Sequence, residues 1–189
     1  TIFGQQVLMA KLKFPDLSKM LKTEEIPDFL KPYLKFLGLG IPSNLDAWDG
    51  YPAARNNLYQ LMKSAKKEFI SLAGDTHNSW VSELENQSGG KVGIELGTPS
   101  VTSPGITDVL NLDEDKFVDS IVKINKELQW MDPSNRGYLF LDCLEDKIIA
   151  SFNYIKELNN INAEISSSQS FVIYREGLKL EKIKPSSIK

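Results

Sequence analysis

A short apolar run that ends in a glycine and a polar turn is the feature that most constrains the fold of this chain. Residues 69–72 predict a buried strand, which Gly74 ends. The turn that follows carries Asp75 and His77, the only histidine among 189 residues. At the carboxyl end of a sheet strand, side chains point into the crevice where open α/β sheets bind ligands. A carboxylate and an imidazole on such a turn can converge on one metal ion. The spacing alone leaves an equal alternative, a turn aspartate beside an incidental histidine.

The composition is typical of one globular domain and excludes several classes of function. Hydrophobic residues make up 41% of the chain, enough to bury a core. The net charge of −3 argues against a role as a scaffold that binds nucleic acid and against electrostatic binding to anionic membranes. No stretch approaches the roughly 18 apolar residues of a transmembrane segment. Cys143 is the only cysteine, which excludes an intrachain disulfide, and its apolar surroundings predict a buried structural thiol.

Residues 11–47 depart from a compact sheet connection and predict an inserted helical lobe. Pro32 is expected to break or kink its helix, and Gly38 and Gly40 to end it. A stripe of apolar residues at helical spacing usually forms core, but near the strand ends it would also suit a rim or lid. The residues of this stripe are Phe29, Tyr33, Phe36 and Leu37.

The rest of the pattern predicts an α/β chain with antiparallel hairpins at its C-terminal edge. Helices are expected at residues 53–66 and 113–127. Their buried faces are expected to hold Leu58, Leu61, Met62 and Ala65 in the first, and Phe117, Ile121, Ile124 and Leu128 in the second. Strands are expected at residues 2–9, 69–73, 92–97, 138–144, 147–154, 170–174 and 178–183, with polar segments at 83–90 and 159–169 and a frayed tail at 184–189.

Five motifs, in this order, resemble the PhoD-like phosphatases, the alkaline phosphatase D family of metallophosphoesterases. The turn described above, GDTHNSW, fits that family's G-D-x-H-x-S-W, and a hydroxyl-rich loop about twenty residues later fits its T-P-S-V-T-S-P-G. The other three motifs fit a G-[QN]-Q-V strand, a W-D-G-Y-P-A-x-R helix entry and an R-G-Y-x-x-L-D strand. The five segments are residues 4–9, 48–55, 74–80, 98–105 and 136–142, so the resemblance extends over nearly the whole chain.

The resemblance implies an α/β fold, the C-terminal half of a metallophosphoesterase-type β-sandwich flanked by helices. Residues 1–158, with the helical insertion at 11–47, would belong to the catalytic domain, and residues 159–189 would add its last β-hairpin and tail. Family members are several hundred residues long, so the chain is interpreted as a C-terminal portion. The expected partner is the N-terminal half of the same protein, or a second copy or chain, covering an exposed sheet edge.

The same resemblance implies hydrolysis of phosphomonoesters or phosphodiesters by a metal-activated water at a dinuclear site of iron and calcium. Asp75 and His77 would be ligands, one leaning toward each metal. Two of about seven ligands cannot hold two metals, so the chain alone is expected to be inactive, with no metal bound. The family implies a periplasmic or secreted location. The alternative is a non-catalytic binding or structural fragment, or a degenerate homologue.

Five further residues are candidates for supporting roles around those ligands. Gln6 would donate a hydrogen bond near the metals or be satisfied by backbone groups, with equal weight. Asp49 would cap the helix that follows it, the favoured reading, or lie near the metals. Asn78, Ser79 and Thr102 would orient a phosphate or hold Asp75. Trp80, next to them, is expected to pack and pin the loop.

Overall fold

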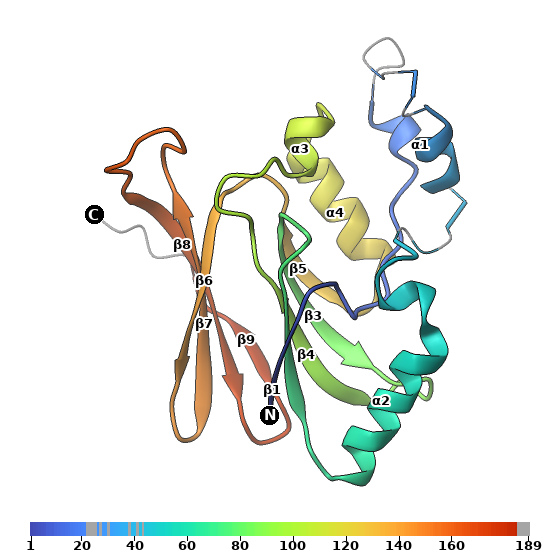
Figure 1. Ribbon diagram of the computed structural model, residues 1–189, viewed down its shortest axis with the longest axis vertical. Helices are drawn as coiled ribbons and strands as arrows, with labels where there is room; N and C mark the ends of the chain where they lie inside the picture. The colour runs from blue at the N-terminus through green and yellow to red at the C-terminus, as the bar shows by residue number, and fades with distance from the viewer. Residues whose placement is uncertain are drawn as a thin grey trace.

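The structure is a computed structural model that describes residues 1–21, 26, 28–29, 31–37, 39–40, 42 and 44–184. Two β-sheets lie face to face, and the helices cover the outer side of one of them (Figure 1). This is a β-sandwich-like α/β arrangement, and the expected fold class is confirmed. No helix among the described residues is long and apolar enough to cross a bilayer.

The first sheet is mixed and holds the predicted strand at 69–73. In it β1, β2 and β4 run parallel, and β3 pairs antiparallel with both β4 and β5. Strand β2 is buried along almost its whole length, as its apolar sequence predicts. In the order of the sheet, the strands are β1 (Ile2–Gln5), β2 (Phe69–Ala73), β4 (Lys91–Gly97), β3 (Ser79–Glu85) and β5 (Leu128–Asp132).

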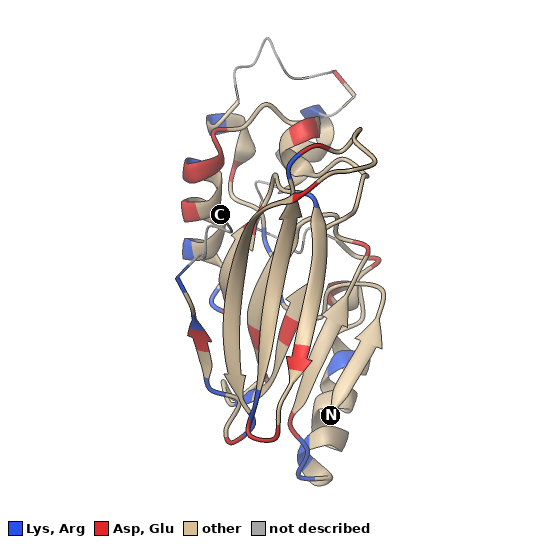
Figure 2. Ribbon diagram, turned by 90° about the vertical axis from the view of Figure 1, so that its left-hand side faces the viewer, with Lys and Arg blue, Asp and Glu red and all other residues tan. Residues whose placement is uncertain are grey.

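The second sheet is an antiparallel meander that packs on the first. Side chains of its central strand β7 alternate between buried and half-buried, because successive residues point to opposite faces. Trp130 of β5 contacts Phe152 and Phe171, with ring centroids 5.2 and 5.3 Å away. Charged residues gather at the turns that join the strands of the second sheet (Figure 2). The strands are β6 (Gly137–Cys143), β7 (Lys147–Ile155), β8 (Ile165–Tyr174) and β9 (Leu180–Lys182).

The helices and the lobe cover the opposite face of the first sheet. Two apolar clusters lie beneath them, one under α2 and one between α4 and the lobe. The short helices α1 and α3 lie at the same end of the molecule (Figure 1). The helices are η1 (Leu17–Lys19), α1 (Lys31–Leu37), η3 (Trp48–Gly50), α2 (Pro52–Ser64), α3 (Ile106–Val109) and α4 (Glu114–Ile124).

Strand β1 forms an edge of the described sheet. It pairs only with β2 there, and the large side chains of Ile2 and Phe3 are exposed. An edge with exposed apolar side chains is unusual for a strand that faces water alone. The strand ends at Gln5, which is half-buried, and Gln6 after it is exposed, so the strand expected at residues 2–9 is shorter than predicted.

Three further expectations about the strands are wrong. Cys143 is exposed, because it ends the edge strand β6 and has no sheet neighbour on one side. The segment expected as a turn at 83–90 continues β3 to Glu85, since Leu84 still points into the core. The linker expected at 159–169 already contains β8 from Ile165, whose serine-rich start hides the strand pattern.

Three expectations about the helices also change. Helix α2 buries Arg55 and Tyr59, whereas Leu61 and Ala65 are exposed. Helix α4 stops at Ile124, which is exposed, and Leu128 belongs to β5, although Asp113 caps the helix as expected by accepting from the Lys116 amide.

In the lobe, the helix forms despite its proline. Pro32 does not break α1, because it lies in the first turn, where its missing N–H costs nothing. The helix buries Leu34 and Leu37, so of the expected stripe only Leu37 is core, while Phe29, Tyr33 and Phe36 are exposed. Gly38 and residues 185–189 lie outside the described residues.

Candidate active site

The carboxyl ends of the three parallel strands meet at the predicted turn. The backbone amides of Gly74 and Asp75 donate to the carbonyl oxygen of Gln6, at 2.9 and 3.0 Å, and the Thr98 amide donates to that of Ala73 at 2.8 Å. These bonds tie the ends of β1, β2 and β4 together. The turn therefore lies where α/β sheets place their ligands.

The Thr76 hydroxyl holds the turn in a strained conformation. It accepts from the indole Nε1 of Trp80 at 2.7 Å and from the Asn78 amide at 3.2 Å, and it donates to the Asn78 carbonyl at 2.8 Å. Inside this ring of bonds His77 has φ of 58°, the left-handed region that few side chains adopt. Such strain persists only where neighbours enforce it, and it is frequent at functional sites.

The imidazole of His77 is oriented by a different segment. Its Nδ1 lies 3.0 Å from the carbonyl oxygen of Pro104. A carbonyl oxygen can only accept, so the proton of the neutral ring is on Nδ1. Nε2 then carries the free lone pair, which is the usual arrangement of a metal-ligating histidine.

Four of the seven predicted site residues share one cavity. Asp75, His77, Asn78 and Asp49 all line a cavity of about 650 Å³ between the turn, the lobe and α3. The Asp75 carboxylate is exposed, and none of the described residues donates a hydrogen bond to it. Asp75 and His77 therefore offer an oxygen and a nitrogen to the same space.

Two of these four residues already have structural partners. The Asn78 side chain is buried and donates from Nδ2 to the carbonyl oxygen of Pro133, at 2.8 Å. Asp49 does not cap α2, whose N-cap Tyr51 makes no side-chain bond. Its Oδ1 instead lies 2.7 Å from Nη1 of Arg55, and both side chains are less than a tenth exposed.

The other three predicted residues lie outside this cavity. Gln6 is exposed, and it contributes its backbone carbonyl rather than its side chain to the turn. Ser79 is buried and accepts from the Tyr154 hydroxyl at 3.0 Å, which links the two sheets. Thr102 is exposed on the loop after β4.

The sequence did not predict that three acidic side chains and an asparagine accept hydrogen bonds from the backbone of the segment after β1. Five consecutive amides, from residue 9 to residue 13, donate to four side chains, which belong to β4, η3 and the connection between α4 and β5. The Met9 and Ala10 amides donate to Glu95 at 2.7 and 2.8 Å, and the other acceptors are Glu127 for Lys11, Asp49 for Leu12 and Asn125 for Lys13. A charged residue inside the apolar strand β4 was the available signal.

Glu95 is fully buried, and burial raises its pKa to about 7. The Met9 and Ala10 amides act against that rise, because their hydrogen bonds favour the ionised form. This carboxylate faces the chain backbone and not the cavity, so its role is to hold the segment that leads into the lobe.

A complete metal site is not present in the described chain. Within the residues that the structure describes, no group of three or more His, Cys, Asp or Glu side chains could hold a metal ion. Asp75 and His77 are two candidate ligands at the wall of the cavity.

Known proteins resemble this chain in both sequence and structure. Alkaline phosphatase D of Bacillus subtilis (strain 168) is 30% identical over 150 residues, which cover 77% of this chain and 25% of that protein. A solved structure described as "Structure of PhoD" matches with a TM-score of 0.70 and 26% identity, over 100% of this chain and 32% of the other. The chain thus spans a quarter to a third of the length of these relatives. The family model described as PhoD-like phosphatase matches residues 1–152, and this chain belongs to that family.

Proposed function

We propose that this chain supplies the Asp75 and His77 part of the metal site of a phosphoesterase, which hydrolyses phosphomonoesters or phosphodiesters. One observation carries the proposal. The hydrogen bond between His77 Nδ1 and the Pro104 carbonyl leaves Nε2 available beside the Asp75 carboxylate, which has no hydrogen-bond donor among the described residues, at a cavity where three strands end. The membership of a phosphatase family supports the same class of reaction.

The donor set fits the metals that the family resemblance implies. A neutral imidazole suits iron, and a carboxylate suits harder cations such as calcium. We propose that His77 Nε2 binds iron and that the Asp75 carboxylate leans toward calcium. Such a pair of metals lowers the pKa of a bound water and neutralises the phosphoryl oxygens.

The residues of this chain orient and shield the reacting groups. The Pro104 carbonyl orients the imidazole and the Thr76 hydroxyl fixes the turn that carries it, so the ring does not have to be ordered during the reaction. Asn78 fixes the turn to the loop around Pro133. The cavity walls keep bulk water away from one side of the ligands.

We propose that the remaining ligands come from other polypeptide. The chain covers 25% of the curated relative, and the apolar edge of β1 is open among the described residues. We propose that the N-terminal half of the same protein, or a second copy or chain, pairs with this edge and completes the metal site. The 189 residues alone are then expected to turn over p-nitrophenyl phosphate well below ~1 per second. A periplasmic or secreted location, implied by the family resemblance, is part of this proposal.

The test is a pair of near-isosteric substitutions in the full natural chain that contains these residues. Asp75→Asn removes the charge, and His77→Asn keeps a residue that tolerates the left-handed conformation. Both variants are expected to lose metal, measured by elemental analysis, and hydrolysis of p-nitrophenyl phosphate and its bis ester. Thermal melting should change little once metal is removed from all samples.

The matched control is Asp142→Asn, which changes an exposed carboxylate on β6. It is expected to keep full metal and full activity. If His77→Asn also kept both, the assignment of this turn to the metal site would be wrong, and His77 would be a turn residue without a ligand role.

A further inference from the structure

We propose that the cavity beside Asp75 and His77 binds an apolar group, alkyl or aryl, of the phosphate ester. This inference rests on the proposed function, because it names the part of the substrate that lies next to the scissile phosphate. The cavity of about 650 Å³ is within the usual range for small-molecule sites.

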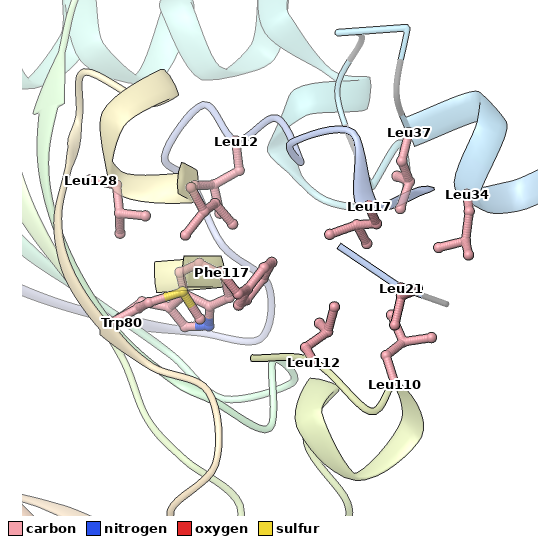
Figure 3. Packing of buried hydrophobic residues seen from close by; sticks show 12 residues of the cluster. Leu12, Leu17, Leu21, Leu34, Leu37, Trp80, Leu110, Leu112, Phe117 and Leu128 are labelled. Carbon is pink, nitrogen blue, oxygen red and sulfur yellow. The ribbon is translucent and has the colours of Figure 1, made fainter. Parts of the chain in front are cut away.

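The inner wall of the cavity is apolar on both sides. The lobe contributes leucines from η1 and α1, and the opposite side contributes Ile106 and Leu110 from α3 and the residue after it. Figure 3 shows Leu17, Leu34 and Leu37 of the lobe facing Leu110, beside which Leu21 of the lobe lies. The lobe leucines of the wall are Leu12, Leu17, Leu34 and Leu37.

The cavity offers little to a charged or sugar-like substituent. None of the described residues that line it is a lysine or an arginine, and of its two acids Asp49 is already paired with Arg55. The side chains of Thr76 and Asn78 are also engaged, with Trp80 and with Pro133. A second phosphate or a set of hydroxyl groups would lose its water there without replacement, which is costly.

The rim of the cavity faces solvent and, beside the polar Asn44, carries large apolar side chains. Tyr33, Leu45 and Val109 line it and are 50%, 58% and 57% exposed. Covering such side chains with an apolar ligand removes their surface from water and favours binding. The rim and the inner wall together select an occupant with an apolar body and a phosphate at the Asp75 and His77 end.

Binding of straight-chain alcohols to the full natural chain tests the cavity without any metal chemistry. 1-Butanol, 1-hexanol and 1-octanol are titrated by isothermal titration calorimetry into metal-depleted protein. Each added methylene is expected to tighten binding about fourfold, the equivalent of about 0.8 kcal/mol. Affinities that do not depend on chain length would overturn the proposal. The absence of any binding would overturn it too, because it would mean that other residues of the full chain already fill the cavity.

Substitutions at the rim locate the binding. Leu45→Glu and Val109→Glu place a charge at exposed positions, so the fold should survive, and octanol affinity should fall about tenfold or more. Leu61→Glu is the matched control, because Leu61 is 68% exposed on α2 and does not line the cavity. Equal effects of all three substitutions would place the bound alcohol elsewhere and contradict the proposal.

Hydrolysis separates this inference from the proposed function. With metal restored, kcat/KM for alkyl phosphates should rise with chain length in the unmodified protein and stay flat in Val109→Glu. His77→Asn should keep octanol binding and lose hydrolysis. If octanol binds but no phosphate ester is cleaved, the proposed function fails alone. If esters are cleaved without any preference for chain length, the apolar subsite is refuted alone.

Discussion

The imidazole Nδ1 of His77 forms a hydrogen bond with the carbonyl oxygen of Pro104, which lies 27 residues away in the sequence. The bond joins the turn after β2 to the loop after β4, so the ring's orientation depends on a backbone that His77 does not belong to. The next residue, Gly105, is buried and tightly surrounded: an added Cβ would meet Asn78 Nδ2, and it would lie 3.0 Å from both Arg136 Nη1 and the Pro133 carbonyl oxygen.

We therefore expect Gly105→Ala to disturb the candidate site from outside it. The methyl group must push the Asn78 side chain or the Pro133 backbone, at a cost of about 1–3 kcal/mol in the free energy of unfolding. The Pro104 carbonyl moves with Gly105, so metal content should fall as well. Urea unfolding and elemental analysis measure the two effects. Ser64→Ala is the control, because Ser64 is exposed at the end of α2 and does not line the cavity.

The buried Glu95 predicts a pH dependence of stability. Its pKa is about 7 in the folded protein and the ordinary 4.5 in the unfolded chain. Between these values the folded protein keeps a proton that the unfolded chain has lost, so stability falls as pH rises from 4.5 to 7. The change contributed by this group is on the order of 3 kcal/mol.

Urea unfolding at several pH values checks this slope in the native protein and in Glu95→Gln. The variant cannot ionise, so the part of the slope due to Glu95 should vanish. At pH below 4.5 the variant should also be less stable by about 1–3 kcal/mol, because an amide offers fewer acceptors to the Met9 and Ala10 amides. This difference should shrink as the pH rises toward 7, because only the native protein loses stability over that interval. An unchanged slope would show that another group causes it.

The ion pair of Asp49 and Arg55 is expected to stabilise the folded state and to take no part in the reaction. Asp49 also accepts from the Leu12 amide at 2.9 Å, and Arg55 also donates to the Met9 carbonyl at 2.9 Å. Breaking such a buried pair leaves one charge without a partner, so Asp49→Ala and Arg55→Ala should each cost about 3–5 kcal/mol. The double variant should cost less than the sum of the two, which thermal and urea unfolding of all three would show.

The sequence predicts local features of this fold well and interactions between distant segments poorly. The strand at 69–73 and the turn with Asp75 and His77 follow from a local pattern of apolar residues and glycine. The hairpins of the second sheet do so too, because their turn residues are adjacent in sequence. The family resemblance adds the fold class, which the structure confirms.

The misplaced residues are those whose environment depends on a distant segment. Leu61 continues the apolar pattern of α2, yet none of the described residues covers it and it is 68% exposed. Arg55 is buried because it pairs with Asp49 and donates to the Met9 carbonyl. Cys143 lies in an apolar strand but at the edge of its sheet. The residues of a strand do not show whether it lies at the edge or in the middle of a sheet. The same limit applies to Ser79, whose neighbour Tyr154 lies 75 residues further on.

The bond between Ser79 and Tyr154 gives the last prediction, which separates a structural from a substrate-facing role. Burial raises the pKa of Tyr154 above its ordinary value, so its hydroxyl remains protonated and donates to Ser79 Oγ across the two sheets. Ser79→Ala and Tyr154→Phe should each lower the free energy of unfolding by about 1 kcal/mol. In a double-mutant cycle the two effects should couple, since both remove the same bond.

Neither substitution is expected to change kcat or KM for phosphate esters, because Ser79 does not line the cavity of Asp75 and His77. The measurement is urea unfolding of the four proteins of the cycle, beside the kinetics of the full natural chain. A Ser79→Ala variant with native stability and lost activity would contradict the structural role. The hydroxyl would then have to reach the substrate, which would require the turn before β3 to open during turnover.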